Sequence, residues 1–171
     1  MYIAGDIGNT DTKICLISKD FKILRRFNYS SVKIRNSNSI NFIKSLFRLN
    51  LEYALFSSVV PRVYKKIKKL LRKKGIKCYE LKNLDLKNFI NLKVNKKQVG
   101  SDRIANAIGV IDKKKNYIIV DFGTATTFDV IIKKDYLGGV IAPGVDLSLK
   151  TLISKASLIP KVKLKKIKSV V

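Results

Sequence analysis

The chain of 171 residues contains no histidine and only 12 acidic residues. Without imidazole, it cannot use a Ser-His-Asp triad or a histidine-ligated metal. Proton transfer must therefore fall to Asp, Glu, Lys, Tyr or Cys, and the scarcity of carboxylates leaves few candidates for a general base.

Cysteine and long apolar runs are also scarce. The two cysteines, Cys15 and Cys78, lie far apart and no Cys-x-x-Cys pair occurs, so we expect reduced core thiols and no zinc site. The apolar stretches are far shorter than the roughly 18 residues of a membrane span. No signal peptide is recognised at the start of the sequence. These features predict a cytoplasmic protein without a membrane partner.

Positive charge greatly exceeds negative charge, and the formal net charge is +24. Most of the cations are Lys, scattered in groups of one to three, and Ile and Asn are abundant as in chains from AT-rich genomes. No zinc finger, RNA-recognition signature or aromatic-interleaved basic ribbon is present. We therefore expect no specific nucleic-acid partner, only weak, salt-sensitive binding to polyanions. A basic nucleic-acid-binding protein remains an alternative.

Two segments share one design. Residues 1–10 and 117–127 each contain a β-branched run, then Asp-x-Gly and hydroxyl residues, and a second apolar run follows each of them. This pattern predicts a strand, a tight turn and a returning strand. Backbone N–H groups and hydroxyls of such turns bind anions, and the neighbouring Asp can hold a cation. Two facing turns of this kind would bind the phosphates of a nucleotide.

The periodicity of the chain predicts an α/β architecture that starts twice. We expect a first half over residues 1–98 and a second half over 99–171. Strands are predicted at 2–8, 12–18, 21–29, 53–57, 76–81, 117–121, 126–133 and 135–142. Helices are predicted at 39–49, from Pro61 to Gly75, at 101–112 and from Gly144 to about Ser157, and residues 30–37 are predicted to be a loop. The second half has fewer elements than the first, so we expect a truncated chain.

Five segments, in order, resemble the signature of the type III pantothenate kinases. They are 6–10 (Asp-Ile-Gly-Asn-Thr), 57–61 (Ser-Ser-Val-Val-Pro), 100–107 (Gly-Ser-Asp-Arg-Ile-Ala-Asn-Ala), 121–129 (Asp-Phe-Gly-Thr-Ala-Thr-Thr-Phe-Asp) and 136–144 (Tyr-Leu-Gly-Gly-Val-Ile-Ala-Pro-Gly). A single Asp-x-Gly-x-Thr recurs by chance, whereas five blocks in register are specific. The resemblance implies a duplicated ribonuclease-H-like fold of the actin-like ATPase superfamily, here with an incomplete second half.

The resemblance also implies a reaction, in which ATP phosphorylates pantothenate to 4′-phosphopantothenate in the first step of coenzyme A biosynthesis. It implies Mg²⁺, a monovalent cation such as K⁺ or ammonium, and a homodimer. Asp102 would be the proton acceptor, and Asp121 would bind the monovalent cation. The implied substrate-binding residues are Gly100, Ser101, Asp102 and Arg103. The implied ATP-binding residues are Asp6, Ile7, Gly8, Asn9, Thr10, Asp11, Thr12, Lys13 and Thr124.

The residue types suit these roles independently of the resemblance. Asp102 opens a predicted helix, whose dipole favours a carboxylate that could accept a proton from a primary hydroxyl. Taken alone, Asp102 would more often be a simple helix cap. Gly100 permits close approach of the backbone. Asn9 and Thr10 can donate hydrogen bonds to phosphate oxygens, and Lys13 can add positive charge.

Three departures and two rival functions bear on activity. The family usually has a Tyr, often with a Pro, before Gly-x-Asp-Arg, whereas residues 91–98 contain neither, and Ser101 replaces an Ala. The family also continues past a Lys-Ser-Val-like segment, where this sequence stops. One rival is a non-catalytic relative that keeps the nucleotide cleft as a regulator or assembly partner. The other is a different sugar or acetate kinase, against which the 100–107 block argues.

Overall fold

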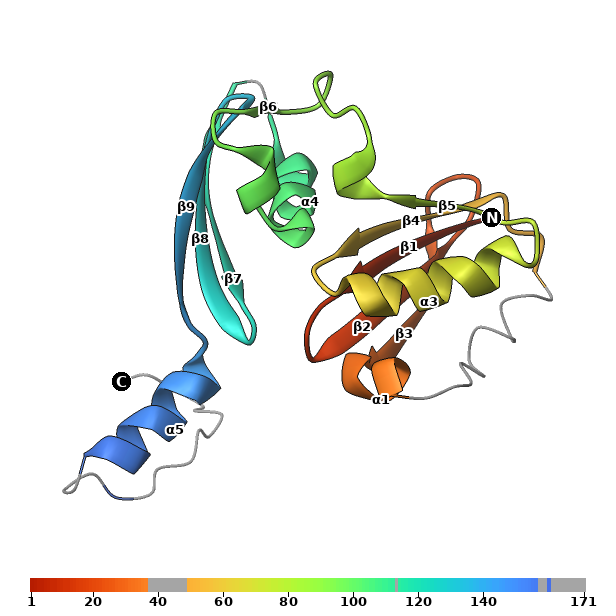
Figure 1. Ribbon diagram of the computed structural model, residues 1–171. Coiled ribbons are helices and arrows are strands. Elements are labelled where there is room, and N and C mark those ends of the chain that lie inside the picture. Colours follow the sequence, from red (N-terminus) through yellow and green to blue (C-terminus); the bar gives the residue numbers. More distant parts are fainter. Residues whose placement is uncertain (37–48, 113, 157–159, 161–171) are drawn as a thin grey trace.

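A computed structural model describes residues 1–36, 49–112, 114–156 and 160, and shows two units, each built on its own β-sheet (Figure 1). The first sheet has five strands in the order β3-β2-β1-β4-β5. The strands are β1 (Tyr2–Ile7), β2 (Asp11–Ile17), β3 (Ile23–Ser30), β4 (Tyr53–Ser58) and β5 (Lys77–Glu80). Strands β1 to β3 form an antiparallel meander, whereas β4 lies parallel to β1 and β5 lies parallel to β4.

The core of the first unit follows from alternation along β1. Ile3 and Ile7 point to one face and are buried, as the period of two in a strand requires. Helices α1 (Ser31–Asn36) and α3 (Pro61–Arg72) contribute to the same core, and Ile67 of α3 belongs to it. Pro61 occupies the first turn of α3, where its missing N–H costs nothing.

The second sheet has four strands in the order β6-β9-β8-β7. They are β6 (Asn91–Leu92), β7 (Asn116–Phe122), β8 (Ala125–Ile132) and β9 (Asp135–Pro143), and β7 to β9 again form an antiparallel meander. Helix α4 (Ser101–Val110) lies on one side of this meander, and α5 (Val145–Lys155) extends beyond its end (Figure 1). Ile104 and Ala107 of α4 pack with Ile131 and Tyr136 in a second core.

The structure confirms the α/β class and the predicted strands, with small shifts of their ends. The prediction of a loop over 30–37 was wrong, because residues 31–36 form α1. Most of the helix predicted over 39–49 lies outside the described residues. The boundary predicted between residues 98 and 99 stays a prediction, although Leu86 and Ile90 already pack in the second core.

Two short 3-10 turns, η1 (Leu81–Asn83) and η2 (Lys96–Gln98), join the units together with β6. Sequence periodicity indicated none of these three elements, because each has only two or three residues. Cys15 and Cys78 are free thiols, as expected, and only Cys78 is buried. Among the described residues, no helix is long and apolar enough to cross a membrane.

Candidate functional site

The two Asp-x-Gly turns face each other across the space between the units. The hydroxyls of Thr10 and Thr124, one from each turn, share a hydrogen bond of 2.9 Å. In the first turn the Gly8 N–H donates to the Asp11 carbonyl, and in the second the Gly123 N–H donates to the Ala125 carbonyl, each at 2.9 Å. A cavity of about 290 Å³ lies between the turns and is lined by residues of both. The two similar sequence segments therefore form the two sides of one crevice.

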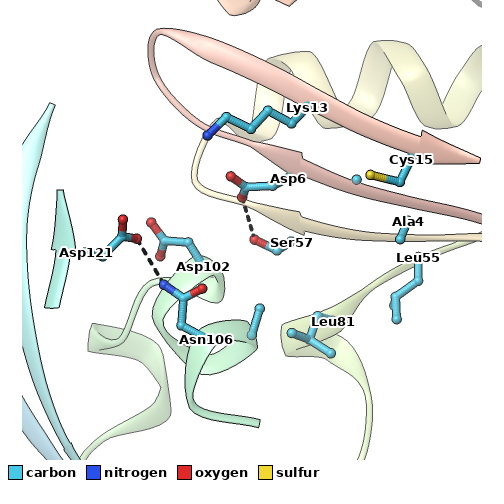
Figure 2. Close-up of a pocket in the computed structure, with 12 residues that line it drawn as sticks. Ala4, Asp6, Lys13, Cys15, Leu55, Ser57, Leu81, Asp102, Asn106 and Asp121 are labelled. Carbon is cyan, nitrogen blue, oxygen red and sulfur yellow. Dashed lines mark hydrogen bonds between the residues drawn. The ribbon is translucent and has the colours of Figure 1, made fainter. Parts of the chain in front are cut away.

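Besides Asp11 of the first turn, three carboxylates from three different elements line this crevice. Asp6 comes from the end of β1, Asp102 from the start of α4 and Asp121 from β7 (Figure 2). Ser57 on the parallel strand β4 donates a hydrogen bond of 2.9 Å to Asp6, and the Asn106 amide donates one of 2.9 Å to Asp121. Neutral donors thus orient two of the three carboxylates.

The Asp102 carboxylate lies at the N-terminus of α4. It accepts a hydrogen bond of 2.8 Å from the backbone N–H of Arg103, in the first turn of that helix. A Cβ on the neighbouring Gly100 would come within 2.3 Å of the Asp102 carboxylate oxygen. Any side chain at position 100 would therefore displace this carboxylate, and glycine avoids the clash. The helix dipole at this position favours the negative charge of a carboxylate.

The electrostatics of the crevice differ from those of the whole chain. Burial raises the pKa of Asp6, the Ser57 hydrogen bond opposes this shift, and the negative charges of Asp102 and Asp121 raise the pKa further. Lys13 supplies a positive charge that lowers it, and Figure 2 shows its ammonium group near Asp6. Carboxylates that repel one another at a partly buried site are suited to hold a cation.

The donor set fits a cation shared with a phosphate better than a fully protein-ligated ion. Among the described residues, no group of three or more Asp, Glu, Cys or His side chains is close enough to hold a metal. Mg²⁺ commonly binds proteins through one or two carboxylates and completes its shell with phosphate oxygens and water. The carboxylates of Asp6, Asp102 and Asp121 are suited to that second arrangement.

A second cavity of about 360 Å³ adjoins the crevice and shares Asp6, Asp102 and Asp121 with it. Its remaining wall is mostly apolar and comes from both units, through Ala4, Cys15, Leu55, Leu81 and Ala105. Figure 2 shows Leu55 and Leu81 on the side of the cavity away from Asp121. The carboxylates therefore stand between a polar crevice and an apolar pocket.

A buried ionic network holds α4 against the second sheet. The Arg103 guanidinium contacts Asp129 of β8 through Nε at 2.9 and 3.2 Å and through a terminal nitrogen at 2.6 Å. The hydroxyl of Tyr136 donates to the same carboxylate, and both Asp129 and Tyr136 are fully buried. The Asp129 hydrogen bond is the main reason that the pKa of Arg103 is raised. This network fixes the start of α4, and with it Asp102.

The family profile described as type III pantothenate kinase matches residues 2–171. A type III pantothenate kinase of Pelagibacter ubique is 55% identical over 177 residues, which cover 100% of this chain and 70% of that protein. The chain belongs to the type III pantothenate kinase family. Another type III pantothenate kinase, from Persephonella marina, is 37% identical over all of this chain and 71% of its own length. Relatives of this family are therefore longer than the chain.

Solved structures agree with the fold expected for a type III pantothenate kinase. A Campylobacter jejuni protein described as a Baf family transcriptional activator superposes with a TM-score of 0.52 at 20% identity, over 91% of this chain and 61% of its own. A Sinorhizobium meliloti protein described as a 2-dehydro-3-deoxygalactonokinase gives a TM-score of 0.52 at 7% identity, over 92% and 58%. At these identities the likeness concerns the fold, and it confirms the actin-like ATPase class.

Most residues proposed from the type III pantothenate kinase signature meet at the crevice, but some of their side chains do not. Ile7 and Thr12 are fully buried, and the Thr12 hydroxyl is hydrogen-bonded to Ser31 at 2.8 Å. The Ser101 side chain is buried as well. None of these three residues lines the crevice or the apolar pocket beside it. The proposed residues that do line the crevice are Asp6, Gly8, Asn9, Thr10, Asp11, Lys13, Asp102, Asp121 and Thr124.

From the sequence we predicted that Arg103 contacts the substrate, and we predicted no role for Asp129, Asn106 or Ser57. In the structure the Arg103 guanidinium faces Asp129, inside the second unit. Asn106 follows Asp102 by four residues on α4, so the helical repeat places both on one face. Ser57 lies near the end of β4, which pairs in parallel with β1 and places Ser57 opposite Asp6. Ser57, Asn106 and Asp129 all lie inside the signature blocks. Membership of these blocks is the sequence signal that could have indicated a role for them.

Proposed function

We propose that this type III pantothenate kinase chain binds the phosphates of ATP between its two Asp-x-Gly turns and presents the acceptor hydroxyl of pantothenate to Asp102. The observation that supports this most strongly is the meeting of Asp6, Asp102 and Asp121 with the hydroxyls of Thr10 and Thr124, from both units, at one crevice. Phosphoryl transfer requires positioning and charge neutralisation more than covalent help from the protein.

The phosphate tail of ATP would lie along the turns. Thr10 and Thr124 would exchange their mutual hydrogen bond for bonds to phosphate oxygens, and Asn9 would add an amide donor. Lys13 would contribute a positive charge at the side of Asp6. These contacts are made by neutral donors and one ammonium group, which together can hold several oxygens in a fixed orientation.

The carboxylates would hold the cations that the family requires. Asp6 is suited to Mg²⁺ bound with the phosphates, and Asp121, oriented by Asn106, is suited to the monovalent cation. Mg²⁺ bound with ATP supplies neutralisation of the charge that develops on the transferred phosphoryl group. The raised pKa of Asp6 supports this assignment, because a nearby cation would offset the burial and the repulsion by Asp102 and Asp121 that raise it.

Asp102 would act as the general base. Its carboxylate would accept the proton of the primary hydroxyl of pantothenate while the hydroxyl oxygen forms its bond to the γ-phosphorus. The bond from that phosphorus to the bridging oxygen breaks, and ADP leaves with the bonding electrons. Arg103 and Asp129 would keep α4, and so Asp102, in place during this transfer.

The apolar pocket would receive the body of pantothenate. Its wall of Ala4, Leu55, Leu81 and Ala105 suits the geminal dimethyl group of that substrate, and Asp102 lies where the pocket meets the crevice. The homodimer and the cytoplasmic location implied by the resemblance belong to this proposal too. Light scattering of the purified chain and imaging of a tagged chain would test them.

Isothermal titration and a coupled kinase assay test the proposal together. We expect ATP with Mg²⁺ to bind the chain and Asp102→Asn to retain this binding while product formation is lost. The matched control is Asp20→Asn, a carboxylate of the same type in the exposed β2–β3 turn. Binding of ATP without binding of pantothenate would instead favour the non-catalytic relative, and absence of nucleotide binding would contradict the whole proposal.

A further inference from the structure

Four aromatic side chains form a row across the first sheet, which we call the aromatic row. It consists of Phe21 in the β2–β3 turn, Tyr2 of β1, Tyr53 of β4 and Tyr79 of β5. The ring centroids of Tyr2 lie 5.9 Å from Phe21 and 4.5 Å from Tyr53, with interplanar angles of 23° and 31°. The rings of Tyr53 and Tyr79 meet edge to face at 6.5 Å. Each ring of the row therefore contacts the next.

The aromatic row lies on the face of the sheet opposite the core. Tyr2 pairs with Tyr53 across the parallel strands β1 and β4, so both rings project to the same side. The next residues along these strands, Ile3 and Ala54, point the other way and are buried in the core shared with α1 and α3. No part of that core covers the aromatic row.

Most of the aromatic row is open to solvent. Phe21 is 76% exposed, Tyr53 is 37% exposed and Tyr79 is 41% exposed. Phe21 has a φ of 60°, a conformation that bulky residues rarely adopt. The Ser18 hydroxyl, which accepts a hydrogen bond of 3.0 Å from the Lys22 N–H, closes this turn. Aromatic rings usually add to a core, so connected rings that stay exposed indicate a ligand with flat faces.

The aromatic row is separate from the crevice between the units. Tyr2 begins β1, whereas Asp6 lies four residues later, about 13 Å along the strand at about 3.3 Å per residue. In Figure 1 the start of β1, beside the N label, lies at the end of the first sheet that points away from the second unit. An inference from the aromatic row therefore does not depend on the proposed ATP and pantothenate sites.

Two basic cavities adjoin the Tyr79 end of the aromatic row. Six of the twelve residues of α3 are Lys or Arg, and none is acidic. Arg72 of this helix and Lys77 of β5 line a cavity of about 260 Å³ together with Tyr79. Arg72 also lines a cavity of about 500 Å³ on α3, whose lining is entirely cationic. Its lining residues are Lys65, Lys68, Lys69, Arg72 and Lys73.

The charges and the rings together indicate the kind of ligand. Asp20 and Glu52, which precede Phe21 and Tyr53 in the sequence, each already form an exposed ion pair with a lysine, at 3.2 and 3.3 Å. The cations of α3 and β5 therefore dominate the surface beside Tyr79, and they suit an anion. A single-stranded nucleic acid combines phosphates with exposed base faces, whereas the bases of a duplex already stack on one another.

We propose that the aromatic row and the two basic cavities bind single-stranded nucleic acid without sequence preference. Unpaired bases would stack on the exposed rings of Phe21 and Tyr79, and the phosphates would lie along Lys77, Arg72 and the cations of α3. The net charge by itself predicts only weak, salt-sensitive binding to any polyanion. The rings add contacts that a duplex or another polyanion cannot make.

Fluorescence anisotropy with a labelled oligo(dT) of about 16 nucleotides tests the role of the rings. Phe21→Ala and Tyr79→Ala should each weaken binding about fivefold or more, because each removes a surface on which a base stacks. Tyr79→Phe keeps the ring and should retain the affinity. The matched control is Phe89→Ala, which removes a ring that is 58% exposed but lies outside the aromatic row. It should leave the affinity unchanged.

The salt dependence of the same binding tests the cavities. Arg72→Gln and Lys77→Gln should each lower the slope of the logarithm of affinity against the logarithm of salt concentration by about 0.7, as expected for one lost phosphate contact to a single strand. Lys150→Gln, at an exposed position of α5, is the matched control and should not change the slope. A duplex of the same length should bind about fivefold more weakly than oligo(dT).

Three outcomes would overturn the proposal. Equal affinity for the duplex, or unchanged binding after Phe21→Ala, would reduce the interaction to net charge alone. Binding to vesicles that contain phosphatidylserine, without binding to oligo(dT), would make the basic surface a membrane contact. Displacement of oligo(dT) by ATP would place the nucleic acid in the crevice. Circular dichroism shows whether each variant folds, and Phe21→Ala, in an exposed turn, decides the question even if Tyr79→Ala is unfolded.

Discussion

The buried pair of Arg103 and Asp129 allows a prediction whose size follows from the structure. Asp129 is fully buried, and the Arg103 side chain is only 10% exposed. Asp129→Asn keeps the shape of the side chain but leaves the guanidinium without its counter-ion. Removing one partner of a buried ion pair costs about 3–5 kcal/mol of unfolding free energy. For a chain of this size, the melting temperature should fall by roughly 6–20 °C.

The assay is urea unfolding followed by far-ultraviolet circular dichroism, with the melting temperature measured in parallel. The double variant Arg103→Met, Asp129→Leu should lose clearly less than the sum of the two single losses, because it leaves no unpaired buried charge. Asp20→Asn, which breaks the exposed pair of Asp20 with Lys22, should change the stability little, because solvent screens an exposed ion pair. The reasoning is refuted if Asp129→Asn costs as little as this control or if the double variant is simply additive.

Three further predictions concern the crevice. The raised pKa of Asp6 means that the unfolded chain releases this proton at lower pH, so the folded state loses relative stability as pH rises above 3.8. Asp6→Asn should therefore stabilise the chain at neutral pH but not below pH 3.8, as urea unfolding at both pH values can show. Thr10→Val should weaken ATP binding by about three- to tenfold in calorimetry, because it removes one hydroxyl donor. Asp102→Asn should reduce phosphorylation of pantothenate by about 100-fold or more with ATP affinity retained, and unchanged turnover would remove Asp102 as the base.

The strands and the crevice were predictable because local chemistry determines them. Alternating apolar residues and the Asp-x-Gly turns indicate two meanders without any knowledge of tertiary contacts. Helix α1 was missed because its residues are mostly polar and its length is only six residues. Contacts distant in sequence hold it in place, including the hydrogen bond between Thr12 and Ser31. The periodicity of the local sequence does not indicate such contacts.

The role of Arg103 was hidden for a related reason. Its position beside Asp102 suggests a ligand contact, whereas the direction of its side chain depends on a carboxylate 26 residues later. Gly139, opposite Asp129 on β9, also matters, because a Cβ there would come within 2.7 Å of the guanidinium. Only the folded register of β8 and β9 brings these groups together. The exposure of Ile118 and Phe122 on β7 was unpredictable for the opposite reason, because their alternation along the strand resembles that of a buried strand.

The acidic crevice lies in a chain whose formal net charge is +24, and this contrast acts differently at long and short range. Far from the surface, the summed charge attracts every nucleotide and is screened as ionic strength rises. Within a few ångströms, the carboxylates of Asp6, Asp102 and Asp121 repel a bare triphosphate but tolerate one whose charge a divalent ion has already reduced. We therefore expect the net charge to attract nucleotides of every kind to the protein. We expect the crevice itself to select those nucleotides that carry a bound divalent ion.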